Sequence, residues 1–462
     1  MLKHYSAVPE ALQAYLNVNS EREIPYQYMR MGLMTVVAAL LSRRAYVNFG
    51  DSALYPNMFT ILVGEPATRK NSVITYLKGL AAYAGYDLFS STHTNRSTLL
   101  KELRCPMDAR RKQSLNAVVS AATQDLSRKL TMGINLKDWM VDGLKEDYNV
   151  NDPNALVVID DDEIIPEAEK TSELFLCLEE LVDITSKQGN SDLFTTLNNL
   201  WDAPPVYTDA PSSQVVVRPT VNVLGGLNPA SFGKVFLKTE LGSGLITRVL
   251  IVRGIPTKRK LSPLAIKTDP NVDKLLIQFF KRIMQFSGEI KFSPDATDLY
   301  NLIYEKQPRV RDARFDSYNE RRFVHLAKMC MVNAACRDSH IIHRDDVMYC
   351  NTLLTFLEIN MGRALGDYEV DKRSQTLNTI VNYLNTLPDK SATTREVGSY
   401  LSGTYTSVEV AAGISLGTHK SILTMAAGSK IYLNDTNEDY QYDQILYDST
   451  IIHEWSIEDK SG

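Results

Sequence analysis

The sequence has few cysteines, and none of them forms a metal-binding pattern. The 462-residue chain contains five cysteines and seven histidines. There is no C-x-x-C pair and no histidine at zinc-site spacing, so we expect buried free thiols in a reducing compartment. The histidines show no nucleophile–base arrangement, which leaves a protease or related hydrolase poorly supported. The cysteines are Cys105, Cys177, Cys330, Cys336 and Cys350.

Long hydrophobic runs are also missing. Residues Met1–Glu10 lack the apolar core of a signal peptide. The longest apolar run near the N-terminus, Met31–Leu41, is shorter than the roughly 20 residues that cross a bilayer. We therefore expect no membrane segment and a cytoplasmic protein. Internal repeats and low-complexity segments are absent from the sequence as well.

An excess of positive charge is the third absence. The net charge is −5, from 50 Lys and Arg against 55 Asp and Glu. This argues against non-specific binding of nucleic acid by the whole surface, although a local basic channel is compatible with it. The hydrophobic fraction of 44% is ordinary for a globular protein. The length predicts two to four domains.

The order of patterns predicts an α/β core with helical additions on both sides. Residues 1–50 have helical periodicity, in Val8–Leu16 and Tyr26–Arg43. Residues 51–257 alternate strand-like and helical runs, which indicates a mainly parallel sheet. Residues 258–370 are again helical and are expected to form a helical lid beside the α/β core. We expect strands over Phe59–Val63, Asp87–Ser91, Ala155–Ile159, Val215–Leu224 and Arg248–Val252, and lid helices over Val272–Phe286, Asp295–Tyr304, Phe315–Cys336 and Arg344–Met361.

A polar helical stretch, Thr98–Asp147, lies between the second and third expected strands and contains the basic run Arg110–Lys112. A solvated helix face explains such a run, and a contact with nucleic acid or a partner is the alternative.

Residues 371–462 predict a winged-helix-like domain. Three helices are expected, followed by a hairpin of Lys430–Leu433 and Tyr440–Leu446. A winged helix reads DNA with its third helix, which here offers only His419 and Lys420, and the wing is acidic. We therefore favour a docking or weak DNA-binding module. The expected helices are Ser374–Leu387, Thr394–Leu401 and Ser415–Ala427.

A stretch after the strand Phe59–Val63 has the layout of a phosphate-binding loop. Its residues are Gly64-Glu65-Pro66-Ala67-Thr68-Arg69-Lys70-Asn71-Ser72, and a helix is expected over Val73–Tyr83. Strand, turn with lysine, and helix N-terminus together supply backbone N–H groups and a cation for phosphates. The usual pattern is G-x-x-x-x-G-K-[ST], so Arg69 replaces a glycine and Asn71 replaces the Ser or Thr that ligates Mg²⁺. The side-chain carbonyl of Asn71 or the hydroxyl of Ser72 is the candidate metal ligand.

Acidic residues follow a second buried strand. Ala155–Ile159 ends in Asp160-Asp161-Asp162-Glu163, and clustered acids at a strand end need a cation or polar partner. In ATPases of this layout the first acid holds Mg²⁺ and the next activates water. Asp160 fits the first role. Asp161 is the nearest candidate for the second, with Glu163 as its competitor, and an acidic loop is the alternative.

Two further polar residues lie near expected strand ends. Asn228 ends the segment Val221–Leu227, where it would orient the attacking water or touch the γ-phosphate; a plain Asn-Pro turn is the alternative. Arg248 follows a glycine turn, Gly242–Gly244, and is a candidate arginine finger for a neighbouring subunit's ATP. A surface salt bridge would explain the arginine equally well.

In this order the motifs resemble the replicative helicase-like ATPases of phages, prophages and plasmids, a RecA/AAA+-type family often fused to or encoded near a primase. The resemblance covers about residues 20–365. It implies a P-loop ATPase that uses ATP and Mg²⁺ and acts on single-stranded DNA as a ring oligomer such as a hexamer, in the host cytoplasm if a phage encodes it. A primase is an implied replication partner. The matching segments are Leu54–Asn57, Thr92–Leu103, the acidic strand end, Leu200–Pro204, Leu224–Pro229 and Gly244–Leu250.

The resemblance assigns the roles above to Lys70, Asp160, Asn228 and Arg248. The sequence departs from the family at Asn71 and at Asp161-Asp162, where the family usually has Ser or Thr and Glu. These departures bear on the rate of hydrolysis more than on nucleotide binding. Two other hypotheses therefore stay open: an ATP-binding switch, such as a helicase loader or replication initiator, and a non-enzymatic DNA-binding scaffold with a degenerate loop.

Overall fold

The structure is a computed structural model, and it describes the sheet, most of the helices around it and a small carboxyl-terminal unit. Three of the predicted site residues, Asp160, Asp161 and Glu163, lie outside the described residues, as do the strand expected over Ala155–Ile159 and the run Arg110–Lys112. The described residues are 10–19, 22–91, 94–104, 172–182, 191–208, 215–236, 244–254, 269–306, 310, 315–365, 372–419, 422–426, 428–434 and 447–448.

A four-stranded parallel sheet carries the site. Its order is β4 (Ser172–Leu178), β7 (Pro219–Leu227), β3 (Phe59–Val63) and β8 (Val249–Arg253), and every neighbouring pair is parallel. All residues of β3 and β7 are buried, as expected for strands covered on both faces. The predicted mixed α/β class with a parallel sheet is confirmed at this level.

The structure confirms some of the strands expected from the sequence and contradicts others. Phe59–Val63 is confirmed, and the strand expected over Arg248–Val252 is shifted by one residue. The single strand expected over Val215–Leu224 is wrong, because Arg218 has a φ of 47° and separates β6 (Val216–Val217) from β7. The strand expected over Asp87–Ser91 reduces to one parallel bridge between Phe89 and Phe175.

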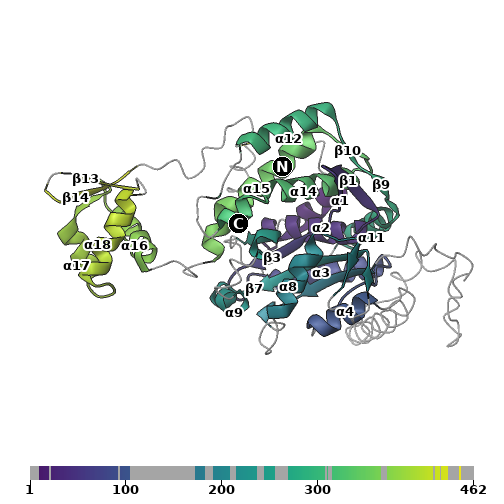
Figure 1. Cartoon of the computed structure of the whole chain (residues 1–462), viewed down its shortest axis with the longest axis horizontal. Coiled ribbons are helices and arrows are strands. Elements are labelled where there is room, and N and C mark those ends of the chain that lie inside the picture. Colours follow the sequence, from purple (N-terminus) through teal and green to yellow (C-terminus); the bar gives the residue numbers. More distant parts are fainter. Residues whose placement is uncertain are drawn as a thin grey trace, which may run out of the picture.

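The helices surround the sheet, and α2 is the most deeply buried of those described (Figure 1). Almost every side chain of α2 is buried, and it packs against α3, α11 and three strands of the sheet. The apolar run Met31–Leu41 is therefore a core helix. The described helices up to residue 364 are α1 (Glu10–Asn19), α2 (Tyr26–Leu41), α3 (Lys70–Tyr83), α4 (Arg96–Arg104), α8 (Ser191–Trp201), α9 (Phe232–Val235), α11 (Pro270–Gln285), α12 (Pro294–Lys306), α13 (Asp316–Asn319), α14 (Arg322–Cys336) and α15 (Arg344–Ala364), with short 3-10 turns η2 (Pro229–Ser231) and η3 (Ile246–Arg248).

Short strands extend this framework at its borders. They pair as β2–β1–β9, β10–β11 and β5–β6. Their bounds are β1 (Ala45–Phe49), β2 (Ser52–Leu54), β5 (Val206–Tyr207), β9 (Gly288–Glu289), β10 (Lys291–Phe292) and β11 (Ile341–Ile342). One hydrophobic cluster runs from Ala11 to Leu365, so the regions predicted as amino-terminal helices, ATPase core and lid share a core.

The carboxyl-terminal unit has its own core, from Leu377 to Ile431. It consists of α16 (Lys372–Thr386), β12 (Ser391–Thr393), α17 (Thr394–Leu401), α18 (Ser407–His419), β13 (Leu423–Ala426) and β14 (Lys430–Leu433). The strands form an antiparallel sheet in the order β12–β14–β13.

One prediction for this unit is wrong in position. The third helix was expected over Ser415–Ala427, but α18 begins at Ser407 and ends at His419, and β13 follows. The reason is a reciprocal cap in which Thr406 and Glu409 bind each other's backbone N–H groups and so start the helix early. The hairpin partner of β14 is β13; the expected partner, Tyr440–Leu446, lies outside the described residues.

A search of the described helices for a membrane span finds none with the required length and apolar character.

Candidate functional site

The loop between β3 and α3 makes a tight turn in which two residues adopt left-handed backbone angles. Ala67 has a φ of 66° and Arg69 a φ of 67°, a conformation that costs a residue with a Cβ about 1–2 kcal/mol. Thr68 braces the turn, since its hydroxyl donates to the Glu65 carbonyl at 2.7 Å. Arg69 also pairs with Glu23 at 2.8 Å. The arginine in the usual glycine position thus fits the turn with its side chain anchored outside it.

Lys70 is the first residue of α3 and is buried against the loop backbone. Its ammonium donates to the carbonyls of Gly64 and Glu65, the latter at 3.0 Å. Burial lowers the pKa of Lys70, and the carboxylates of Glu180 and Glu65 oppose that shift. The predicted lysine therefore lies where the loop, a helix N-terminus and an acidic residue meet.

Tyr28 of α2 contacts the backbone that leads into the loop, a contact that the sequence did not predict. Its hydroxyl donates to the Val63 carbonyl at 2.7 Å. A Cβ on Gly64 or on Gly254 would lie 2.2 Å from atoms of the Tyr28 side chain, so both strand ends need glycine here. Burial raises the pKa of Tyr28 to about 12, which keeps the phenol protonated as a donor.

A pair of acidic residues lies beside the loop, at the end of β4. Glu179 and Glu180 follow Leu178 directly, and the next residue, Leu181, donates its N–H to the Gly226 carbonyl at 2.8 Å. The carboxylate of Glu179 accepts from the Thr75 hydroxyl of α3 at 3.0 Å. The Glu180 carboxylate raises the pKa of Lys70, against the lowering caused by burial. The acidic pair and the loop lysine therefore belong to one site.

Gly226 of β7 explains how the acidic segment comes so close. A Cβ at this position would lie 2.4 Å from the Glu179 carbonyl and 3.4 Å from the side-chain oxygen of Asn71. Only a glycine lets the end of β4, the first turn of α3 and β7 meet here. The sequence signal for the acidic pair was present but unused: Leu174–Leu178 is a continuous apolar run that ends in two glutamates.

Asn228 lies beside the loop, directly after β7. It follows β7, whose last residue Leu227 is paired with Val63 of β3. Its side chain accepts from the N–H of Ala230 at 3.1 Å and so caps η2. This contact is the Asn-Pro turn considered from the sequence, and it fixes the side chain at the edge of the sheet that carries the loop.

Arg248 lies at the amino ends of the parallel strands, whereas the loop lies at their carboxyl ends. It precedes β8, whose first residue Val249 is paired with Phe59, the first residue of β3. A five-residue strand, roughly 13 Å long, thus separates it from the loop of its own chain. Its guanidinium donates to Asp202 at 3.0 Å and to the Gly244 carbonyl at 3.0 Å. The structure therefore does not bring Arg248 together with Lys70 in one chain.

The residues available for a cation offer oxygen atoms. Asn71 and Ser72 are exposed in the first turn of α3, and Asn71 faces the backbone of Glu179 across Gly226. Within the part of the chain that the structure describes, no three His, Cys, Asp or Glu side chains form a metal cluster. Mg²⁺ in nucleotide sites is held by one or two carboxylates together with substrate phosphates, so this donor set fits it.

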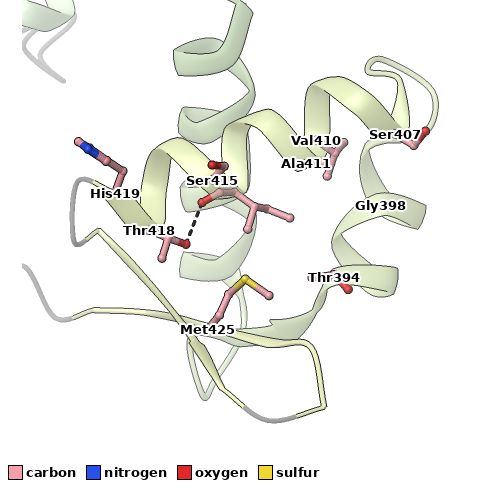
Figure 2. A pocket seen from close by; sticks show the side chains of 10 residues that line it. Thr394, Gly398, Ser407, Val410, Ala411, Ser415, Thr418, His419 and Met425 are labelled. Atoms are coloured by element: carbon pink, nitrogen blue, oxygen red, sulfur yellow. Dashed lines mark hydrogen bonds between the residues drawn. The ribbon is translucent and has the colours of Figure 1, made fainter.

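A hollow lies in the carboxyl-terminal unit, between α17, α18 and β13 (Figure 2). It has a volume of about 650 Å³, and Val410, Ile414 and Met425 give it an apolar lining. Of the described residues that line it, His419 is the one titratable side chain. This described lining does not suit a phosphate, and the loop at Gly64–Ser72 stays the candidate site.

Comparison of the chain with models of known protein families and with curated protein sequences finds no match.

Proposed function

We propose that the chain binds ATP with Mg²⁺ at the loop Gly64–Ser72 and hydrolyses it. The observation that supports this most strongly is the meeting of Lys70, the N-terminus of α3 and the pair Glu179–Glu180 at the carboxyl edge of a parallel sheet. Backbone N–H groups and a lysine suit phosphates, and open parallel sheets bind ligands at this edge.

The residues of the chain divide the work as follows. Lys70 binds the phosphates in exchange for the loop carbonyls that it contacts here. Glu179 and the side-chain oxygen of Asn71, or the hydroxyl of Ser72, hold Mg²⁺, which when bound neutralises the phosphate charge. Glu180 accepts a proton from the attacking water. We assign these roles to Glu179 and Glu180 because both follow β4 beside the loop, whereas Asp160 and Asp161 lie outside the described residues.

We further propose that hydrolysis drives a helicase or translocase on single-stranded DNA in the replication of a phage or mobile element. The resemblance of the motif order to replicative helicase-like ATPases supports this, as does the position of Arg248 at the amino ends of the strands, away from the loop of its own chain. A ring oligomer and a replication partner such as a primase belong to this proposal. In the carboxyl-terminal unit, three helices and a three-stranded sheet favour a winged helix for docking or weak DNA binding.

The test compares single-residue variants in a Mg²⁺-dependent ATPase assay with single-stranded DNA present. Lys70→Ala removes phosphate binding and is expected to abolish activity. Glu180→Gln keeps ATP binding and lowers kcat by about 10²–10⁴-fold, the usual contribution of a general base. Lys101→Ala, an exposed lysine of α4, is the control.

Asp160→Asn and Asp161→Asn complete the set. If they abolish hydrolysis while Glu179→Gln and Glu180→Gln retain it, the acidic strand end predicted from the sequence carries the chemistry and our assignment is wrong. If wild-type protein hydrolyses ATP slowly and assembles with nucleotide but separates no strands, the switch hypothesis replaces the motor. If calorimetry finds no ATP binding at millimolar Mg²⁺, the scaffold hypothesis does.

A further inference from the structure

A cluster of cations surrounds Trp201 at the edge of the sheet opposite the loop. The guanidinium carbons of Arg248 and Arg321 each lie 5.7 Å from the centre of a Trp201 ring, and the Lys328 ammonium lies 3.8 Å from it. The three cations come from different places in the fold, just before β8, at the start of α14 and within α14.

One carboxylate faces two of these cations. Asp202 accepts from Arg248 at 3.0 Å through one oxygen, and its other oxygen lies 3.6 Å from Arg321. The neighbouring cation, Arg322, is paired with Glu358 at 2.8 Å instead. Among the described contacts of this cluster, the guanidinium groups of Arg248 and Arg321 therefore share a single carboxylate. An additional anion would be stabilised here.

The cluster is both pre-formed and reachable. Arg248 and Trp201 are at least nine-tenths buried, and no hydrogen-bond partner within the described residues meets Arg248 Nε or Trp201 Nε1. Asp202 is half exposed and Arg321 about one-third exposed. Two guanidinium groups on a solvent-facing carboxylate have the geometry that also receives a phosphate.

We propose that Asp202 holds Arg248 and Arg321 as an internal substitute for phosphate, and that both arginines exchange it for the terminal phosphate of ATP bound to a second copy of the chain. This inference rests on the ATPase function proposed above. The phosphate must belong to another copy, because the length of β3 separates Arg248 from the loop of its own chain. Arg321 then joins Arg248 as a second phosphate-contacting arginine, and Asp202 regulates both.

The experiment mixes two inactive variants. Lys70→Ala has a disabled loop but intact arginines, and Arg321→Ala has an intact loop but lacks the second arginine. Arg321→Ala alone is expected to lower kcat roughly 100-fold while its affinity for a fluorescent ATP analogue stays that of wild type. In an equimolar mixture, about a quarter of head-to-tail interfaces combine an intact loop with intact arginines, so about a quarter of wild-type activity returns.

Asp202→Asn tests the regulatory part, since it removes the competing charge at constant size. The protein concentration that gives half-maximal ATPase activity is expected to fall several-fold. Arg96→Ala, which removes one member of the exposed Arg96–Asp192 pair, is the matched control and should change neither quantity.

The outcomes separate this inference from the ATPase proposal. Wild-type protein that hydrolyses ATP, with a mixture no more active than its components, overturns the second arginine and leaves the ATPase standing. An unchanged or raised half-maximal concentration in Asp202→Asn overturns the regulatory role. Wild-type protein that binds no ATP overturns the ATPase proposal and the inference with it.

Discussion

At the residue scale, the phosphate loop depends on side chains that fit an unusual backbone. Arg69 and Ala67 both have φ near +66°, where glycine would be expected. Thr68 and the pair Arg69–Glu23 compensate part of the cost by bracing the turn. The departure of this loop from the usual motif is thus accommodated by local contacts, and the lysine keeps its position at the first turn of α3.

Lys328 gives a prediction at this scale. It is fully buried on α14, where burial lowers its pKa to about 7. The unfolded chain keeps a lysine protonated to about pH 10, so between about pH 7 and pH 10 the unfolded state binds more protons, and stability rises with pH. We expect Lys328→Met to flatten this rise, by up to about 1.4 kcal/mol per pH unit, in urea unfolding at about pH 7.5 and pH 9.

The difference in pH dependence between wild type and Lys328→Met reports on Lys328 alone, because both proteins contain the same other titrating groups. Equal pH slopes in wild type and Lys328→Met would contradict the buried, poorly protonated lysine.

At the element scale, the site exists because β4 ends against β7 and α3. Leu178 of β4 is paired with Gly225 of β7. The backbone of the next residue, Glu179, then passes so close to Gly226 that no side chain would fit at that glycine. Glu179 and Glu180 are consequently delivered to the loop by the strand register. The backbone approach sets their position, and the hydrogen bond between Thr75 and the Glu179 carboxylate adds to it.

Neighbouring glycines of β7 test this view. A Cβ on Gly226 would lie 2.4 Å from the Glu179 carbonyl, whereas one on Gly225 would make ordinary contacts, the shortest at 3.5 Å. Gly226→Ala is expected to displace the acidic segment and to lower kcat at least tenfold, since misplacement of about 1 Å already costs about 10²-fold in some enzymes. Gly225→Ala should keep near-wild-type kcat. Equal activity of the two variants in the ATPase assay would show that the approach at Gly226 does not position the acids.

At the scale of the whole molecule, the two groups of residues in our proposal lie at opposite ends of the parallel strands of one sheet. The loop and its acids lie at the carboxyl edge, while Arg248, Arg321 and Lys328 lie at the amino edge around Trp201. A head-to-tail assembly would bring the two groups of residues from different copies together, and such contacts form a ring when the rotation between copies closes.

We therefore expect assembly to depend on nucleotide. Light scattering after size exclusion should show a larger species with a non-hydrolysable ATP analogue and Mg²⁺ than without it, because a bound phosphate links two copies through the arginines. Arg248→Ala should weaken this shift, and Arg96→Ala should leave it unchanged. A mass that is identical with and without nucleotide in the wild-type protein would contradict the assembly model.

Much of the fold was predictable because local patterns fix local structure. The predicted bounds of the buried strand Phe59–Val63 and of the helix Thr394–Leu401 agree with the structure. A capping box of Thr393 and Glu396 starts this helix. An equivalent cap of Thr406 and Glu409 starts α18, eight residues before the start expected from its sequence pattern. The break at Arg218 was not predictable, because a positive φ at an arginine leaves no signature in residue type.

The sequence by itself determined the tight loop Gly64–Ser72, the place of Lys70 in it, and the parallel sheet beneath them, because a strand, a turn and a helix N-terminus are neighbours along the chain. Only the tertiary structure decided which acids join Lys70, that Tyr28 supports the loop, and that Arg248 lies at the other edge beside Asp202 and Arg321. These relations join residues far apart in sequence, and strand order, register and the close approach at Gly226 set them.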